Sequence, residues 1–376
     1  MTQWFTDSFR TEFDKQAEQL GRVNIAIFGK TGVGKSTLVN AIFGEAIAET
    51  GIGAPVTSGS HLYLDARGTL GVVDTRGLEV GRDDDEILKE VTQVVKDGRG
   101  KPLAEQIHVA WYCIRGLDRR FEQVEEDFIC TLAKLGIPVL VVLTQVPMRE
   151  GAYHPDAVNL ARQIEAKNLP IVGGRPFMTY AMRDQFLGQP PHGLMDVLQA
   201  TFQVAPEAVQ AALAAAQILS LELKASQAHK AVVAAAAAAA AAAAVPIPFS
   251  SAAILVPIQL GMMARIAQLF GLGFDRAALL AVASTSVATT AGRAAVTSLL
   301  ELIPGAGTII GGVVNASVAS GFTAAMGEAW LAVCLRAANK TLPQIGGVID
   351  QAAVKKLFEA ELAKRMPRIR RDPAVE

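Results

Sequence analysis

The sequence predicts an α/β fold, with helices on both faces of a mostly parallel sheet, followed by an all-helical hydrophobic half. Short apolar runs such as "VNIAIFG", "IHVAWYCI" and "PVLVVLT" lack alternation of polar and apolar residues, which is typical of strands covered on both faces. The segment "FEQVEEDFICTLAKLG" between two of these runs has helical periodicity, and strands that alternate with helices indicate a parallel sheet. The second half is rich in alanine and shows no strand pattern.

Length and composition narrow the class of protein. A chain of 376 residues favours two domains. The net charge of −1 gives no overall positive field that would attract nucleic acid. The cysteines at 113, 130 and 334 have no metal or redox spacing, so we interpret them as buried thiols in a reducing compartment. The charged N-terminus "MTQWFTDSFRTEFDKQ" does not resemble a signal peptide, and we expect a cytoplasmic protein.

We expect three segments: residues 1–20, 21–200 and 201–376. The first carries large apolar side chains at near-helical spacing and predicts an amphipathic helix that packs on its own protein, with a membrane surface or a partner as the alternative. These side chains are Trp4, Phe5, Phe9, Phe13 and Leu20. The second segment is the α/β domain, and the third is the alanine-rich helical domain.

A glycine-rich stretch after the first predicted strand indicates a phosphate site. It matches G-x-x-x-x-G-K-[ST] and consists of Gly29, Lys30, Thr31, Gly32, Val33, Gly34, Lys35, Ser36 and Thr37. Glycines let the backbone N–H groups point at a phosphate, and the start of the following helix adds positive potential. Lys35 is predicted to reach the β- and γ-phosphates, and Ser36 to coordinate Mg²⁺.

Two further elements support a nucleotide site. "GVVDTRG" ends a predicted strand with the D-x-x-G arrangement, in which Asp74 would help to hold Mg²⁺ and the Gly77 amide would contact the γ-phosphate. In the intervening loop "GAPVTSGS", Thr57 is placed to add its hydroxyl to the Mg²⁺ shell. Ser36, Thr57 and Asp74 are therefore the candidate metal ligands, and Lys35, Thr57 and Gly77 the candidate catalytic residues.

With these motifs, residues 22–185 resemble the Era-like branch of the translation-factor-related P-loop GTPases. The resemblance implies a P-loop GTPase fold, the substrate GTP, the product GDP and the cofactor Mg²⁺. It also implies that Thr57 and Asp74–Gly77 belong to the two switch regions. Base recognition would fall to Thr144 and Gln145, after one strand, and to Ala181 in "TYA", after the last strand. The alanine-rich half resembles a bacterial domain of uncharacterised function that is often membrane-associated.

The sequence departs from this family at the base motif. Where the family has Asn/Thr-Lys-x-Asp, this chain has Thr144, Gln145, Val146 and Pro147. The family's aspartate accepts hydrogen bonds from guanine, and Pro147 cannot. The loss of this acceptor predicts that discrimination of guanine from adenine is weaker by a few kcal/mol, unless a nearby group such as Glu150 replaces the aspartate.

A second departure concerns catalysis. Leu78 follows Gly77 where many relatives have a glutamine that orients water, so we expect slow hydrolysis, with help from elsewhere, often through a nucleotide-dependent homodimer. Candidate charge stabilisers are Arg76, Arg115, Arg119 and Arg120, each of which is more simply a surface residue.

The alanine-rich half leaves two alternatives open. Residues 231–264 and 302–327 contain no charged residue, and the second run has small residues spaced by four, at Gly307 and Gly311 and at Gly312 and Ala316. These features fit a soluble bundle with a core of small residues, or helices that insert into or lie on a bilayer. Low charge favours membrane association at the inner face, with lipid as a partner of the basic tail "AKRMPRIRRD".

The function predicted from the sequence is a GTP-binding switch that hydrolyses GTP slowly and signals to the helical half at a membrane or in an oligomer. Two alternatives remain: a soluble GTPase of RNA or ribosome maturation, and a scaffold that binds nucleotide without hydrolysis. The helical half lacks interleaved aromatic and basic residues, so no nucleic acid is expected as a partner.

Overall fold

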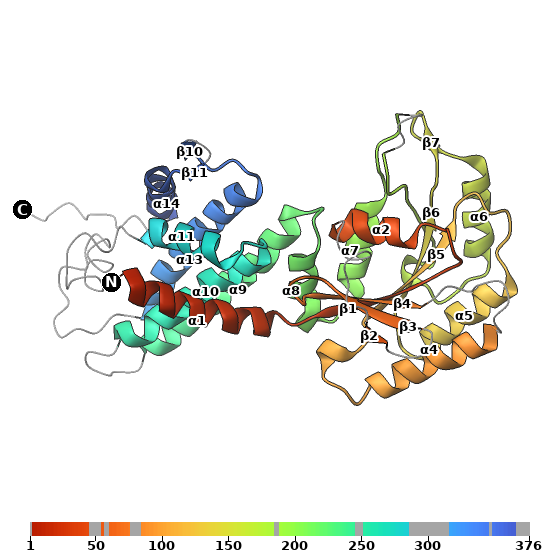
Figure 1. Ribbon diagram of the computed structural model, residues 1–376, viewed down its shortest axis with the longest axis horizontal. Helices are drawn as coiled ribbons and strands as arrows, with labels where there is room; N and C mark the ends of the chain where they lie inside the picture. The colour runs from red at the N-terminus through yellow and green to blue at the C-terminus, as the bar shows by residue number, and fades with distance from the viewer. Residues whose placement is uncertain are drawn as a thin grey trace, which may run out of the picture. The chain divides into compact units, whose positions relative to one another are not determined.

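A computed structural model describes residues 2–44, 54–55, 60–75, 84–183, 188–244, 251–285, 316–345 and 348–365. The chain forms two compact units. One is the α/β unit, Gly21–Ser220, and the other is the helical unit, in which Met1–Leu20 joins Leu221–Glu376. The first helix therefore belongs with the second half of the chain (Figure 1).

The α/β unit is built on a seven-stranded sheet with the order β2-β3-β4-β1-β5-β6-β9. The pairs of β1 with β4 and β5, of β5 with β6 and of β6 with β9 are parallel, whereas β2 and β3 are antiparallel at one edge. The strands are β1 (Val23–Phe28), β2 (Ala54–Pro55), β3 (Ser60–Leu64), β4 (Leu70–Thr75), β5 (Val109–Arg115), β6 (Val139–Thr144) and β9 (Phe177–Met178). The predicted mostly parallel sheet is confirmed.

Helices cover both faces of this sheet. They are α2 (Lys35–Phe43), α4 (Asp84–Gly98), α5 (Gln123–Lys134), α6 (Pro155–Ala166), α7 (Leu194–Val204) and α8 (Glu207–Ala216), with short 3₁₀ turns η1 (Leu103–Glu105) and η2 (Val172–Gly174). On one face, Trp111 stacks on Phe43 of α2 and donates to Thr201 of α7. On the other, Tyr112 joins a core with Phe128 of α5. Neighbouring residues of β5 thus face opposite layers, which explains why its buried residues, 109–114, form an uninterrupted apolar run.

The α/β unit extends to Ser220, beyond the boundary near residue 200 that the sequence suggested. Helix α8 contacts β1 and β4. Two hydrogen bonds fix the end of α8 and the segment that follows it. The Arg67 guanidinium donates to the carbonyl of Ala215 in α8, and the Ile218 N–H donates to the carbonyl of Ile42 at 2.9 Å. The segment thereby satisfies a carbonyl at the end of α2 that no residue of that helix can reach.

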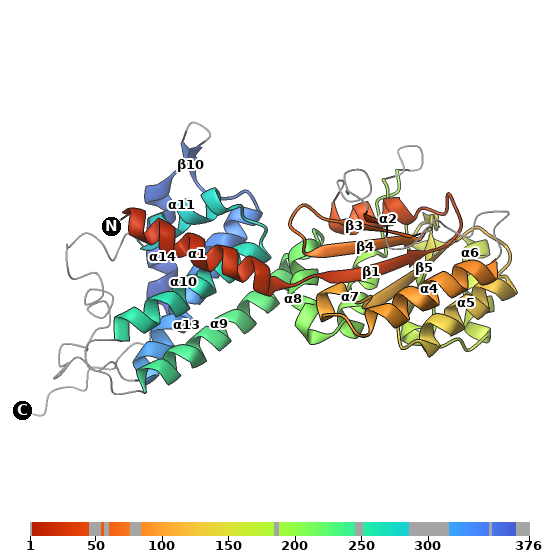
Figure 2. The ribbon, with the colours of Figure 1, turned by 60° about the horizontal axis from the view of Figure 1, so that its bottom comes forward.

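The helical unit contains α1 (Thr2–Leu20), α9 (Leu221–Ala243), α10 (Ser251–Leu269), α11 (Phe274–Thr285), α13 (Ala316–Ala338) and α14 (Gln351–Arg365), with a small hairpin of β10 (Gln344–Ile345) and β11 (Val348–Ile349). The prediction of a helical second half is confirmed (Figure 2). Helix α1 packs on α10 and α11, with Phe9 and Phe13 buried near Phe274 and the Arg10 guanidinium 3.7 Å from the centre of that ring. The part of its apolar face around Phe9 and Phe13 is therefore covered by the chain's own helices, whereas Trp4 is 61% exposed.

Small residues let the helices of this unit approach closely. A Cβ atom at Gly327 of α13 would lie 2.6 Å from the Met262 sulfur on α10 and 2.7 Å from Val232 on α9. Within the described residues, α13 alone is long and apolar enough to cross a membrane, and 61% of its apolar window is buried against the rest of the protein. A core helix of a soluble bundle has the same properties. Gly307, Gly311 and Gly312 lie outside the described residues.

Candidate functional site

The glycine-rich stretch forms a loop between β1 and α2, as the sequence predicted. Gly29, Gly32 and Gly34 have φ angles of 128°, 79° and 98°, which side chains rarely adopt. At Gly29 an added Cβ would also lie 2.1 Å from the carbonyl oxygen of Cys113 in β5. Only glycine fits here, because the loop lies directly against the neighbouring strand.

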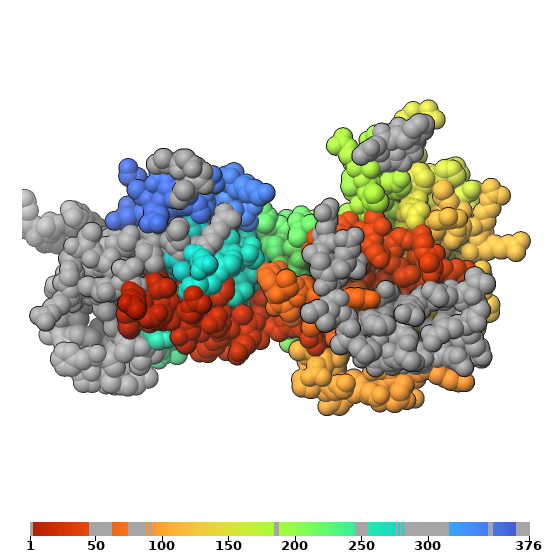
Figure 3. Space-filling model, in the orientation of Figure 1, coloured from red at the N-terminus to blue at the C-terminus, as the bar shows by residue number. Residues whose placement is uncertain are grey.

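Lys35, the first residue of α2, closes this phosphate loop. Its Nζ donates to the carbonyl oxygens of Gly29 at 2.8 Å and Lys30 at 3.0 Å. An ammonium group has three N–H donors, so one direction remains for a phosphate oxygen. The first N–H groups of α2 have no partner within the helix and add positive potential at the same place. Thr31, Gly32 and Ser36 are exposed, and the red-orange atoms of this part of the chain lie at the surface (Figure 3).

Cys113 lies behind the loop and is an inert thiol. Its side chain is 1% exposed, and burial raises its pKa to about 12, although the charge of Lys35 acts in the opposite direction. A thiol with this pKa stays protonated at neutral pH and is a poor nucleophile. The interpretation of Cys113 as a buried apolar residue agrees with this environment.

Thr144 and Gln145 bring the end of β6 to the phosphate loop. The Thr144 hydroxyl donates to the carbonyl oxygen of Val33 and lies 3.2 Å from that of Ile114. The Gln145 side-chain amide donates to the carbonyl of Gly32 at 3.2 Å, and Gln145 has a positive φ of 54°. These side chains, expected at the base, therefore also support the loop that would hold the phosphates.

The two predicted base loops lie together. We call residues 144–147 the first base loop and residues 179–181 the second. The Val146 N–H donates to the Thr179 carbonyl at 3.0 Å. Ala181, two residues after Thr179, is half-buried. Glu150 lies instead at the turn of a hairpin, formed by β7 (Met148–Arg149) and β8 (Ala152–Tyr153), with its side chain 87% exposed.

The side chain of Lys30 points towards the start of α5. Its Nζ lies 2.8 Å from Glu122 and 3.9 Å from the buried Glu125. Burial lowers the pKa of Lys30, but the hydrogen bond to Glu122 and the nearby carboxylates outweigh this effect and raise it. The sequence motifs did not predict this contact between Lys30 and Glu122. The signal available was the E-x-x-E spacing, since Glu122 and Glu125 form a capping box at the start of α5.

The predicted metal ligands are only partly described. Ser36 is the second residue of α2 and is exposed, and the backbone of Asp74 in β4 pairs in parallel with Ile27 of β1, next to the loop. A hydroxyl and a carboxylate are the oxygen donors that Mg²⁺ prefers, so these residue types fit that ion. Thr57 and Gly77 lie outside the described residues, as do Arg76 and Leu78. Across the described ranges, no three His, Cys, Asp or Glu side chains cluster as a metal site of their own.

Of the other candidate arginines, Arg115 and Arg119 form ion pairs at the surface. Arg115 lies 3.1 Å from Asp118, and Arg119 lies 3.8 Å from Asp156 with its own side chain 84% exposed. Arg120 is exposed as well. The interpretation of these arginines as surface residues therefore agrees with the positions that the structure gives them.

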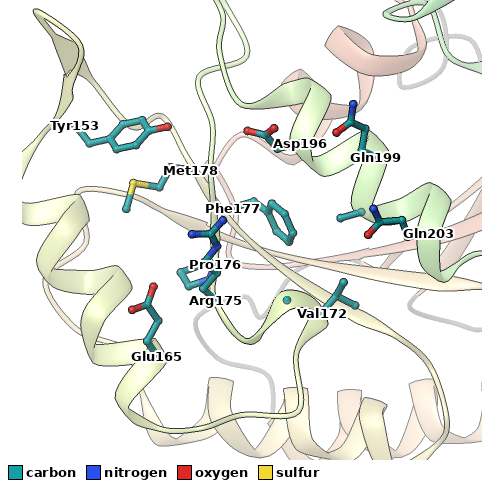
Figure 4. A pocket seen from close by; sticks show the side chains of 12 residues that line it. Tyr153, Glu165, Val172, Arg175, Pro176, Phe177, Met178, Asp196, Gln199 and Gln203 are labelled. Carbon is teal, nitrogen blue, oxygen red and sulfur yellow. The ribbon is translucent and has the colours of Figure 1, made fainter. Parts of the chain in front are cut away.

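A separate cavity of about 480 Å³ lies beside the edge strand β9 (Figure 4). Its walls come from β8, α6, η2, β9 and α7 and include Arg175, Phe177 and, on α7, Asp196. No residue of the phosphate loop lines it. The cavity is therefore distinct from the site built around Lys35.

Residues 24–145 match the family of 50S ribosome-binding GTPases. The α/β unit contains a P-loop GTPase domain. The match runs from β1 through the phosphate loop to Gln145 in the first base loop, and it includes no residue of the helical unit. No curated protein matches this chain.

Among solved structures, the chain is similar to a variant of Era from Aquifex aeolicus bound to GDP and AlF4⁻, at 18% identity over 57% of this chain and 68% of that one, with a TM-score of 0.34. A GDP-bound variant of NFeoB from S. thermophilus has 12% identity over 66% of this chain and 97% of that one, with a TM-score of 0.31. Similarities this low transfer no activity to the GTPase domain.

Proposed function

We propose that this chain is a GTP-binding switch that hydrolyses GTP slowly, with Mg²⁺, and passes its nucleotide state to the helical unit. The observation that carries the proposal is the position of Lys35. Its ammonium group lies inside a loop of left-handed glycines at the start of α2. That arrangement suits the β- and γ-phosphates of a nucleotide, and the family match favours guanine.

The proposed chemistry assigns a role to each predicted residue. The ammonium of Lys35 neutralises developing charge on the phosphates, while Ser36, Thr57 and Asp74 hold Mg²⁺. The amide of Gly77 contacts the γ-phosphate, so that both switch regions become ordered with GTP and are released after hydrolysis. Leu78 cannot orient the attacking water, and hydrolysis by the monomer is accordingly slow. A second copy of the chain would supply the missing group in a nucleotide-dependent dimer.

The base site is proposed to accept guanine with reduced selectivity. Pro147 carries no acceptor for the guanine N–H groups, and the Gln145 amide already donates to Gly32. Glu150 lies at a hairpin turn with its side chain 87% exposed, and we propose that it does not replace the missing carboxylate. Recognition therefore falls on backbone groups of the two base loops and on packing.

The helical unit is the proposed receiver of the signal, in an oligomer or at the inner face of a membrane. The burial of α13 within this unit favours a folded bundle as the resting state, because insertion into lipid would require these helices to separate. Flotation with liposomes of anionic lipid, with GDP and with a non-hydrolysable GTP analogue, tests the alternatives. Binding to liposomes with the analogue alone would support the membrane, and a larger particle in its presence would support the oligomer.

A role at the ribosome is the second candidate function. The description of the matching family, a 50S ribosome-binding GTPase, favours it. Sedimentation of the protein with isolated 50S subunits in the presence of the GTP analogue tests this candidate. Co-sedimentation that requires the analogue would support it, whereas protein that stays in the supernatant in every nucleotide state would exclude it.

Single-turnover hydrolysis separates a slow enzyme from a scaffold that binds nucleotide without hydrolysis. Excess protein is mixed with radiolabelled GTP and Mg²⁺, and phosphate release is followed as the protein concentration is raised. The proposal expects slow, Mg²⁺-dependent release that accelerates if the chain dimerises. Bound GTP that remains intact over many hours at every concentration would contradict the enzyme and support the scaffold.

A further inference from the structure

A short segment after the second base loop folds back onto both base loops. His192 forms an antiparallel bridge with Tyr180, in which the N–H of each residue donates to the carbonyl of the other at 3.0 Å. Gly193 permits this close approach, because a Cβ there would lie 2.0 Å from the Met178 carbonyl oxygen. The backbone of residues 192–193 is thereby fixed to the end of β9 and to the second base loop.

The side chain of His192 reaches the first base loop. Its Nε2 lies 3.0 Å from the carbonyl oxygen of Val146. A carbonyl oxygen can only accept, so Nε2 must carry the proton in this contact. The imidazole ring lies near two tyrosines, with its centre 6.2 Å from that of Tyr180 and 5.6 Å from that of Tyr153. These rings limit the orientations that the imidazole can adopt.

Gln189 holds the same loop from the other side of Pro147. Its Oε1 accepts the Met148 N–H at 3.0 Å, and its Nε2 lies 3.5 Å from the Val146 carbonyl. The Gln189 side chain is 5% exposed, so these contacts are shielded from water. The residues on either side of Pro147 are therefore each anchored by a side chain of the segment 189–192.

We propose that His192 and Gln189 are positioning residues for the nucleotide base. The inference rests on the proposed nucleotide-binding function. In the family that this chain resembles, an aspartate side chain accepts hydrogen bonds from guanine. Here Pro147 offers no such side chain, so recognition depends on backbone groups whose direction follows the orientation of each peptide unit. His192 and Gln189 fix those peptide units and connect the first base loop to the second.

The test compares a ligand that has a base with one that has none. The affinities for GDP and for inorganic tripolyphosphate are measured, both with Mg²⁺, by competition against a fluorescent guanine nucleotide. For His192→Ala and Gln189→Ala we expect GDP affinity to fall by about tenfold, the scale of one shielded hydrogen bond, and tripolyphosphate affinity to stay unchanged. His192→Gln, which keeps an N–H donor on a side chain of similar reach, should recover most of the loss.

Gln163→Ala, an exposed position on α6, and His229→Ala, in the helical unit, are matched controls that should leave both affinities unchanged. An equal loss of GDP and tripolyphosphate affinity would mean that His192 and Gln189 only stabilise the fold, and unchanged GDP affinity would mean that they do not position the base. Either result overturns this inference, but neither contradicts the proposed nucleotide-binding function. Wild-type protein that binds neither ligand would instead refute the proposed function itself.

Discussion

The Gln145 side-chain amide donates a hydrogen bond to the carbonyl oxygen of Gly32, at 3.2 Å. This bond joins the loop expected at the base to the loop expected at the phosphates. It also uses an amide N–H of Gln145 that could otherwise contact a base. With Pro147 two residues later, the side chains of the first base loop contribute little to reading guanine.

This arrangement predicts poor discrimination of the guanine 2-amino group. Inosine triphosphate lacks that group and is otherwise the same ligand as GTP. We expect the two to bind within about threefold of each other, because no carboxylate accepts the amino protons and less than one net hydrogen bond is lost. Competition binding measures the ratio. A preference for GTP of tenfold or more, which Glu150→Ala leaves unchanged, would show that another group reads the amino position.

Gly29 predicts a steric test of the phosphate loop. In Gly29→Ala the new Cβ would lie 2.1 Å from the Cys113 carbonyl, at a φ of 128°. The loop must move away from β5, so we expect the variant to lose nucleotide binding and about 2 to 4 kcal/mol of unfolding free energy. Denaturant titration and nucleotide binding are the measurements.

Gly136→Ala provides the matched control. Gly136 also has a positive φ, of 74°, but a Cβ there would meet no atom within 4 Å. Only the backbone strain of about 1 to 2 kcal/mol is expected, with binding preserved. Equal losses in the two variants would refute the steric account of Gly29.

Glu125 predicts a pH dependence of stability. Burial raises the pKa of this carboxyl above its ordinary value of 4.5, although the Glu122 N–H and Lys30 act in the opposite direction. A raised pKa means that the folded protein binds the proton more tightly, so this stabilising contribution is present below pH 4.5 and is lost as the pH rises through the folded value. Glu125→Gln keeps a side-chain oxygen that can accept the Glu122 N–H, but it does not titrate. The melting temperature of Glu125→Gln minus that of the wild type should therefore increase between pH 4 and pH 7. A difference that does not change with pH, or that falls, would contradict the assignment.

Gly327 and Gly321 predict opposite effects within one helix. Gly327→Ala would force a methyl group against Met262 and Val232, and we expect a loss of about 1 to 3 kcal/mol from overpacking. A Cβ at Gly321 meets nothing within 4 Å, so Gly321→Ala should stabilise α13 by up to about 1 kcal/mol through helix propensity. Thermal unfolding followed by circular dichroism measures both. Stabilisation by both substitutions would indicate that α9, α10 and α13 do not pack as described.

The parts of the fold that depend on local patterns could be predicted from the sequence. The apolar run of β6 and the glycine-rich motif around Lys35 can each be recognised from a few residues. The pattern of a buried strand and the pattern of a phosphate loop both occupy consecutive positions in the sequence. The resemblance to a GTPase family predicted Thr144 and Gln145 at the base, but it did not predict their hydrogen bonds to Val33 and Gly32 of the phosphate loop.

Contacts between distant residues could not be predicted in this way. The ion pair of Lys30 with Glu122, the bond from His192 to Val146 and the bond from Ile218 to Ile42 of α2 join segments far apart in the chain. No periodicity or motif links such segments. The membership of α1 in the helical unit has the same cause: its amphipathic pattern shows that one face is covered, but not which helices cover it.

The central claim is that the Lys35 ammonium, inside the glycine-rich loop, binds the phosphates of a nucleotide. The most direct measurement is the affinity of Lys35→Ala for GDP with Mg²⁺, compared with Lys134→Ala, an exposed lysine at the end of α5. We expect Lys35→Ala to lose at least about tenfold in affinity, since charge-assisted bonds to phosphate contribute about 1.5 to 3 kcal/mol, and Lys134→Ala to match the wild type. Equal GDP affinity of Lys35→Ala and the wild type would contradict the account.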